Sequence, residues 1–337
     1  MEQTLGNITH YLNLRRHEDA SPDFTPCWLP VEFNASALPW TVTGGLAARR
    51  ALKPLIDDVD GVFIHTLTLA LLNADSFGRK PTVLSTDGTP MNKRSMRSDY
   101  GLRPEWRAQE LGKRMLNRQV FARARGFVGW SNWAKQSFVD DYGCRAEDVA
   151  VIPPGIDVDR FVMPERNNEV PRILFVGGDF ERKGGDLLLK VFRRRFLTKA
   201  TLDLVTRSDV AAEPGVRVHN DVAPNSPALL KLYREADIFV LPTRADCFSL
   251  VCMEALASGL PVVTTKVGGI PDIVDDGATG HLLNVDDADA LGDSLFELVT
   301  NPATRHRMGL LGRQAALARF DARQNARALF DFVGSRC

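Results

Sequence analysis

The 337-residue sequence lacks a net charge, paired cysteines and long apolar runs. Its 42 basic and 42 acidic side chains cancel, so overall charge gives no reason to expect nucleic-acid binding. Its five cysteines are odd in number and show none of the short paired spacings of zinc sites, which predicts a reduced, cytoplasmic chain without a metal site. Neither a secretory signal nor an apolar stretch near the roughly 20 residues of a membrane span is evident, so we expect any membrane contact to be peripheral.

Strand-length apolar runs alternate with helical segments along the amino-terminal half. The runs are Trp28 to Phe33, Gly61 to His65, Thr82 to Ser85 and Gly126 to Trp130. This alternation predicts an α/β fold with a doubly wound parallel sheet. Hydrophobic residues make up 44% of the chain, enough for packed cores, and the length suits two domains.

A boundary is predicted where Pro153, Pro154 and Gly155 interrupt regular structure, before a polar, linker-like run at 164–170. We therefore place an amino-terminal domain at residues 1–160 and a second domain at 161–322. The carboxyl segment, residues 305–333, is predicted to be helical.

The most informative stretch, residues 236–280, has a strand–loop–helix–loop–strand pattern. The apolar run Ile238 to Leu241 has strand length, and good helix formers follow from Glu254 until Gly259 ends the helix. Asp246 and Glu254 are separated by seven residues across this strand-to-helix turn.

A helix that begins near Phe248 and Ser249 offers free backbone N–H groups and a positive dipole end to an anionic diphosphate, without a metal. Asp246 could then accept hydrogen bonds from sugar hydroxyls. Glu254, about two turns into the helix, could hold the paired hydroxyls of a ribose. The alternative is that both acids are solvated residues of a loop and a helix.

A glycine-rich turn follows the apolar run Ile173 to Val176. Two glycine pairs, Gly177 with Gly178 and Gly184 with Gly185, bracket Arg182 and Lys183. Small residues let the backbone approach a phosphate, and the basic pair would supply charge-assisted hydrogen bonds to a departing diphosphate. The alternative is a tight strand-to-helix turn with solvated basic side chains.

These motifs resemble the donor site of the family 4 retaining glycosyltransferases (glycosyl transferases group 1), in which seven residues separate two acidic ones. The resemblance covers much of residues 172–333. Asp246 stands where many members carry Glu, and Gly178 stands where the family usually carries Arg. The residues that it implies for donor binding are Gly177, Gly178, Arg182, Lys183, Cys247, Phe248, Ser249, Leu250 and Glu254.

The resemblance implies a GT-B fold, with two Rossmann-like parallel-sheet domains facing a cleft. It also implies that a helix at residues 323–337 crosses back to the first domain. The implied activity is metal-independent transfer of a sugar, as by a hexosyltransferase, from a nucleotide diphosphate sugar to a hydroxyl acceptor, with retention and with no cofactor. A weakened nucleotide-sugar binding protein and a GT-B nucleotide-sugar epimerase are the alternatives.

Acceptor chemistry is expected in the amino-terminal domain. Asp87, just past a strand, could orient the acceptor hydroxyl or take its proton, and His65 ends another strand. The predicted catalytic residues are therefore Asp87, His65, Asp246 and Glu254. An Asx-turn at Asp87 and a structural role for His65 are the alternatives. The opening segment resembles a family loop and helix in which Gly6 and Asn7 lie on the acceptor side, although the first strand of that pattern is missing from this sequence.

Residues 93–125 contain ten basic and three acidic side chains, a surplus of seven positive charges. Such a stretch could attract anionic lipid on the inner face of a membrane, or an acidic acceptor. The alternative is a solvent-facing helix with internal ion pairs. The sequence leaves open the nucleotide base, the sugar and whether the acceptor is a saccharide, a lipid or a small molecule.

Overall fold

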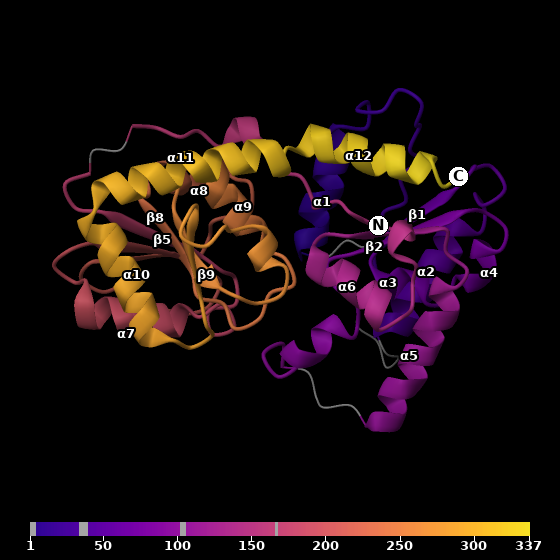
Figure 1. Cartoon of the computed structure of the whole chain (residues 1–337), viewed down its shortest axis with the longest axis horizontal. Coiled ribbons are helices and arrows are strands. Elements are labelled where there is room, and N and C mark those ends of the chain that lie inside the picture. Colours follow the sequence, from indigo (N-terminus) through magenta and orange to yellow (C-terminus); the bar gives the residue numbers. More distant parts are fainter. Residues whose placement is uncertain (1–4, 34–39, 102–105, 166–167) are drawn as a thin grey trace. The chain divides into compact units, whose positions relative to one another are not determined.

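The computed structural model describes residues 5–33, 40–101, 106–165 and 168–337 (Figure 1). The chain divides into two compact units. Unit 1 comprises Met1–Ser98, Leu102–Gly155 and Ala322–Cys337, and unit 2 comprises Asp99–Gly101 and Ile156–Asp321. The sequence analysis placed the corresponding boundaries after residues 160 and 322.

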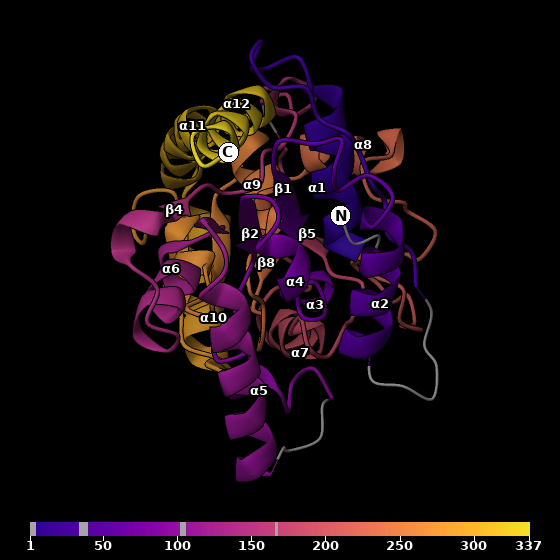
Figure 2. The same ribbon diagram turned by 90° about the vertical axis from the view of Figure 1, so that its right-hand side faces the viewer.

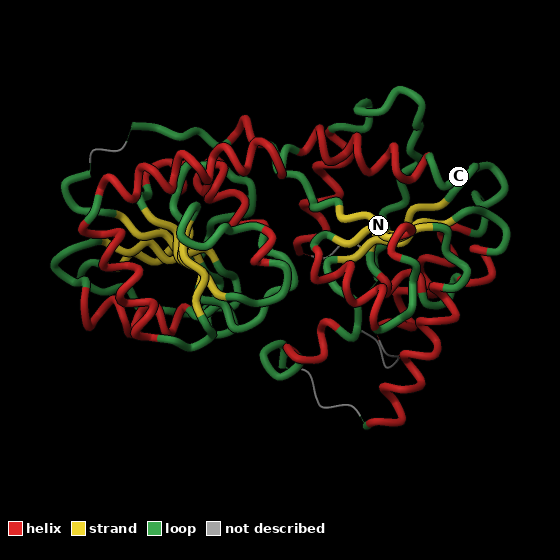
Figure 3. Tube along the Cα trace, in the orientation of Figure 1, coloured by secondary structure: helices red, strands yellow, loops and turns green. Residues whose placement is uncertain are grey.

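Unit 1 is built on a four-stranded parallel sheet in the order β1-β2-β3-β4 (Figure 3). The strands are β1 (Val62–His65), β2 (Thr82–Thr86), β3 (Gly126–Gly129) and β4 (Val149–Val151). Its helices are α1 (Leu5–Arg16), α2 (Trp40–Leu52), α3 (Leu67–Ala70), α4 (Ala74–Phe77), α5 (Arg107–Phe121), α6 (Asn132–Asp140) and α12 (Ala322–Gly334), with short 3-10 turns at Asn92–Met96 and Ala146–Asp148.

Both faces of this sheet are covered, because successive residues of a strand point to opposite faces. On one face Leu84 and Phe127 join a core that includes residues of α2, α3 and α5. On the other face Val83 and Val128 pack with Leu329 of α12 and with residues of α1. The carboxyl-terminal helix is therefore part of the core of unit 1.

The prediction of a strand at Trp28 to Phe33 was wrong. This segment forms no extended ladder, and only Val31 occupies an isolated bridge position. Pro30 has no backbone N–H to give to a sheet, which limits pairing at its centre. The fourth strand is instead β4, which lies just before the prolines that the sequence analysis used to mark the domain boundary.

Unit 2 is built on a six-stranded parallel sheet in the order β10-β9-β8-β5-β6-β7. The strands are β5 (Arg172–Val176), β6 (Thr201–Val205), β7 (Val216–His219), β8 (Ile238–Leu241), β9 (Val262–Thr265) and β10 (Gly280–Leu283). Its helices are α7 (Gly185–Arg195), α8 (Pro227–Glu235), α9 (Leu250–Ala257), α10 (Ala288–Thr300) and α11 (Pro302–Arg319), with 3-10 turns at Val158–Arg160 and Ile270–Asp272.

The strand order of unit 2 is that of a doubly wound nucleotide-binding sheet, in which the order reverses between β5 and β8. Ligands of such sheets bind outside the carboxyl ends of the strands at this reversal. The central strands β8 and β9 are buried along their whole length, as expected for apolar runs in a parallel sheet. The fold prediction of two parallel-sheet α/β domains is confirmed.

Within the described residues, no helix combines the length and the apolar character that a membrane span requires.

Candidate functional site

Three loops meet at the carboxyl edge of the sheet of unit 2, and two glycines make their close approach possible. Gly184, in the loop after β5, has φ 73°, and a Cβ there would lie 2.0 Å from the carbonyl oxygen of Pro242 in the loop after β8. Gly268, in the loop after β9, has φ 55°, and its Cβ would lie 2.0 Å from the carbonyl oxygen of Asp246. Only glycine fits at either contact.

Backbone hydrogen bonds fix the loop after β8 between its two neighbours. Arg244 N donates to the carbonyl oxygen of Arg182 at 2.9 Å, and Gly269 N donates to that of Cys247 at 2.8 Å. The backbone that carries Asp246 is therefore held from both sides, at the reversal of strand order.

The predicted basic pair lies beside the predicted carboxylate. Lys183 Nζ forms an ion pair with Asp246 Oδ2, and both side chains are largely buried. The Arg182 guanidinium donates from Nη1 to the carbonyl oxygen of Ala245 at 2.8 Å and from Nε to Asp179 at 3.1 Å. These contacts place two positive charges against the loop that leads into α9.

The first turn of α9 begins at Leu250, with Ser249 at the N-cap. Ser249 is 2% exposed, and apart from the thiol of Cys252 its Oγ has no hydrogen-bond partner among the described residues. A thiol is a weak partner, so this buried hydroxyl, beside the N–H groups of the first turn of α9, suits a ligand with acceptor oxygens. Cys247 and Phe248 are buried next to it.

Glu254 lies little more than one turn into α9, not two turns as the sequence suggested, because the helix begins at Leu250. Its carboxyl is buried and accepts a hydrogen bond of 2.9 Å from the hydroxyl of Tyr233 on α8. Burial raises the pKa of Glu254 to about 7, against the opposing effects of the Tyr233 hydrogen bond and the Arg160 charge.

The sequence analysis missed Arg207, in the loop after β6. A Cβ on Gly178 would lie 2.8 Å from Nη2 and 2.9 Å from Nε of Arg207, so this guanidinium occupies the space beside the glycine turn. Gly177 N donates to the carbonyl oxygen of Val205 at 2.9 Å, and Phe180 N donates to Ser208 Oγ at 3.3 Å. No local sequence pattern indicates that the loop after β5 lies beside the loop after β6. The two loops are neighbours because β5 and β6 are adjacent parallel strands.

In unit 1, His65 lies at the end of β1 in a buried polar cluster. Its ring nitrogens contact Ser85 Oγ at 3.2 Å and Asn7 Oδ1 at 3.1 Å, and its ring stacks on Trp130 with centroids 5.0 Å apart. The predicted residues Asn7 and His65 are thus brought together, and Gly6 lies beside Asn7 in the first turn of α1.

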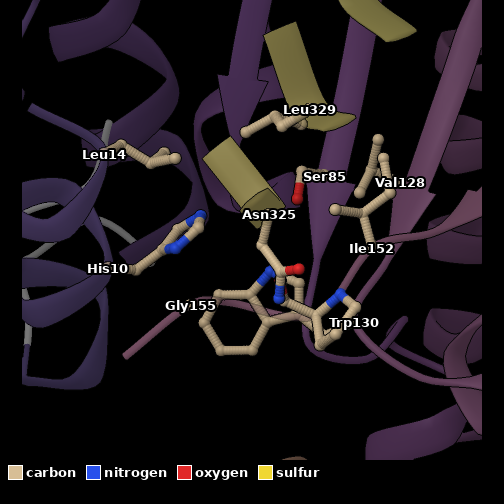
Figure 4. A pocket seen from close by; sticks show the side chains of 10 residues that line it. His10, Leu14, Ser85, Val128, Trp130, Ile152, Gly155, Asn325 and Leu329 are labelled. Carbon is tan, nitrogen blue, oxygen red and sulfur yellow. The ribbon is translucent and has the colours of Figure 1, made fainter. Parts of the chain in front are cut away.

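His10, on α1, is a second buried histidine that the sequence analysis did not single out. Its ring lies 4.9 Å from that of His65, and neither of its nitrogens has a hydrogen-bond partner among the described residues. Burial lowers the pKa of His10 to about 3. Figure 4 shows it at a pocket with Ser85, Trp130 and Asn325, whose volume of about 10 Å³ has room for about one water.

Asp87 follows β2, as predicted, and forms an ion pair with Lys93 at 2.9 Å. Thr86 Oγ1 donates to Asp87 Oδ1 at 3.3 Å. Asp87 is only partly exposed, and the lysine holds its carboxylate in place.

Among the described residues, no three His, Cys, Asp or Glu side chains are grouped in a way that could hold a metal ion.

The chain has two units, each built on a parallel α/β sheet, and a loop cluster at the strand reversal of unit 2. This arrangement is that of the GT-B class. Two family models match the chain: one described as Glycosyltransferase Family 4 at residues 13–160, and one described as Glycosyl transferases group 1 at residues 170–301. The chain belongs to the family 4 glycosyltransferases.

Two curated relatives illustrate the similarity. A D-inositol 3-phosphate glycosyltransferase of Nocardia farcinica is 30% identical over 234 residues, covering 61% of this chain and 51% of the relative. A GDP-mannose-dependent alpha-(1-6)-phosphatidylinositol monomannoside mannosyltransferase of Mycolicibacterium smegmatis is 29% identical over 234 residues, covering 61% of each chain. The chain thus spans about half to three fifths of these relatives.

The similarity in fold extends further than the similarity in sequence. The sucrose-phosphate synthase of Thermosynechococcus elongatus superposes with a TM-score of 0.74, covering 94% of this chain and 86% of the other, at 18% identity.

Proposed function

We propose that this chain is a retaining glycosyltransferase that moves a hexosyl group from a nucleotide diphosphate sugar to a hydroxyl acceptor. The observation that supports this most is the loop cluster at the strand reversal of unit 2. There Lys183 and Asp246 are paired beside the N-terminus of α9, where the buried hydroxyl of Ser249 has only the weak thiol of Cys252 as a partner.

The diphosphate would lie against Lys183, Arg182 and the backbone N–H groups at the start of α9. These groups supply positive charge and hydrogen-bond donors where negative charge develops as the diphosphate leaves. We therefore expect the transfer to need no divalent metal. Glu254 would accept hydrogen bonds from the ribose and Asp246 from the transferred sugar.

In a single-step transfer, retention requires that the acceptor attack from the face that the leaving group vacates. In this step the bond from the anomeric carbon to the diphosphate oxygen breaks, and the acceptor oxygen bonds to the same carbon. The acceptor proton passes to the leaving diphosphate, so no protein nucleophile is required. Asp87 and His65 are the candidates for orienting the acceptor.

The test is a panel of UDP-, GDP- and ADP-sugars in a metal-free buffer with a chelator, read by thermal stability and by release of nucleoside diphosphate. GDP-mannose belongs in it because the mycobacterial relative is named for that donor. A donor at about 100 times its Kd would stabilise the chain by about 2.7 kcal/mol.

The matched variants are Lys183→Met in the site and Lys190→Met on the exposed side of α7. We expect one donor class to raise the thermal stability of the wild type and of Lys190→Met, and both of these proteins to cleave it. In Lys183→Met we expect neither stabilisation nor cleavage. Equal behaviour of the two variants, or no response to any donor, would refute the proposal.

A further inference from the structure

An apolar line of side chains on α5 faces solvent. The helix is anchored through its C-terminal half, where Asn117, Val120 and Phe121 are buried. Nearer its N-terminus, Leu111 is 59% and Met115 is 57% exposed, and Trp106, directly before the helix, is 79% exposed. Figure 2 shows this half of α5 extending away from the rest of unit 1.

Leu111 and Met115 lie on one side of the helix together with Ala108. Ala108, Leu111 and Met115 are three and four residues apart, so they follow a single line along α5. That line is opposite the buried residues of the same helix. A helix of a globular protein normally turns its apolar line inward, so this exposed line, with the basic residues beside it, is a candidate interaction surface.

A line of arginines runs beside the apolar line. Arg107, Arg114 and Arg118 are seven and four residues apart, and α5 carries four basic side chains against one acidic one. Arg114 donates to the carbonyl oxygen of Asp141 at 2.7 Å and 3.0 Å, which fixes the helix on unit 1. Apolar and aromatic side chains flanked by basic ones are typical of helices that lie in the interface of an anionic bilayer.

We propose that α5 docks on a membrane surface that contains anionic lipid. Leu111 and Met115 enter the interfacial layer, and Arg107 and Arg118, which are exposed beside them, contact the headgroups. Arg114 stays bound to the carbonyl oxygen of Asp141. Each basic residue near an anionic surface strengthens binding by about fivefold. The surplus of positive charge on α5 favours an anionic lipid surface over an uncharged protein surface as its partner.

The test is flotation of the full chain with vesicles of phosphatidylcholine alone or mixed with phosphatidylglycerol. The site variant is Leu111→Ser with Met115→Ser. The matched control is Leu310→Ser with Leu317→Ser, which changes two leucines of α11 that are 42% and 39% exposed. Thermal midpoints of all variants show whether each remains folded.

We expect the wild type and the control to bind the anionic vesicles, and the site variant to bind at least tenfold more weakly. High salt should weaken wild-type binding, since the arginine contribution is screened. Failure of the wild type to bind, or equal binding of the site variant, would overturn the proposal. Concentration-dependent self-association that the site variant abolishes, without vesicle binding, would assign the face to a second copy of the chain instead.

A separate observation concerns the glycine turn of unit 2. The guanidinium of Arg207 fills the space that a side chain on Gly178 would enter. Lys183 also borders this turn, since its Cβ lies 2.9 Å from the position that a Cβ on Gly177 would take. Two basic residues from different loops therefore border the turn that follows β5.

We infer that Arg207 supplies to the diphosphate the positive charge that Gly178 lacks, an inference that rests on the proposed function. The loop that carries Arg207 is tied to the glycine turn by the Phe180–Ser208 hydrogen bond, so its backbone is held beside the turn. An arginine from a neighbouring loop can contact a phosphate as well as one on the turn itself.

The test measures affinity for a nucleoside diphosphate and for the corresponding nucleoside. Arg207→Ala should weaken the diphosphate at least tenfold and leave the nucleoside unchanged. Arg193→Ala, which removes an arginine of α7 paired with Glu213, is the control and should change neither.

A rescue variant makes the test more specific. Adding Gly178→Arg to Arg207→Ala should restore most of the diphosphate affinity, because removal of Arg207 empties the space for the new side chain. If the wild type binds the diphosphate and Arg207→Ala binds it equally well, the inference about Arg207 is wrong and the proposed function stands. If the wild type binds no nucleoside diphosphate, both are wrong.

Discussion

Replacing Glu254 with glutamine should stabilise the chain above neutral pH. Burial raises the pKa of Glu254 from 4.5 to about 7, so the folded state holds a proton that the unfolded state has released between these values. Stability from this group is fully present below pH 4.5 and is lost as pH rises through 7. At about 1.4 kcal/mol per pKa unit, the loss is about 3 kcal/mol.

Glutamine has the shape of the protonated acid and no charge to desolvate. We therefore expect Glu254→Gln to match the wild type near pH 4.5 and to be about 3 kcal/mol more stable near pH 8. Its carbonyl oxygen can still accept the hydrogen bond from Tyr233. Urea unfolding at several pH values measures this as a rise in midpoint at constant slope, in the transition that reports on unit 2.

Tyr233→Phe is the control. It removes the hydrogen bond that opposes the rise in the pKa of Glu254. The unfolding free energy of Tyr233→Phe should therefore fall more steeply with rising pH than that of the wild type. A glutamine variant with the same advantage over the wild type at all pH values would refute the reasoning, because the carboxyl would then ionise as readily in the folded state as in the unfolded one.

Three further predictions follow from the same structure. His10→Leu should flatten the loss of stability below pH 6.5, since the lowered pKa of His10 costs the wild type about 2 kcal/mol by pH 5, measurable by thermal unfolding across pH. Gly184→Ala should cost at least about 2 kcal/mol in unfolding free energy because of its positive φ and its contact with Pro242, whereas Gly112→Ala, with open space on α5, should stabilise by about 0.5–1 kcal/mol. Asp87→Asn should slow transfer at least tenfold while donor affinity, measured by calorimetry, stays unchanged.

The fold could be predicted from the sequence wherever buried strands left uninterrupted apolar runs. Ile238–Leu241 is such a run, and all four of its residues are buried. The prediction of a strand was wrong at Trp28 to Phe33. This segment is irregular, yet the apolar side chains of Leu29 and Phe33 pack against the core of unit 1. Local composition cannot distinguish these two cases, because both bury the same kind of side chain.

The candidate site could be predicted where its residues are neighbours in the sequence. The turn after β5 and the turn after β8 each have a local pattern, and the structure brings Lys183 and Asp246 into contact. Arg207 and His10 could not be found in this way. Their roles depend on which strands pair and which helix covers them, and no local pattern encodes that information.

The most direct test of the account is calorimetric titration of the metal-free chain with nucleoside diphosphates and with their hexose conjugates. The account predicts that one base binds as its diphosphate sugar, that Lys183→Met weakens it at least tenfold, and that adding a divalent metal does not change the affinity. Absence of binding for every base, or binding that requires the metal and ignores Lys183→Met, would contradict the claim that the loop cluster of unit 2 is a nucleotide-sugar site.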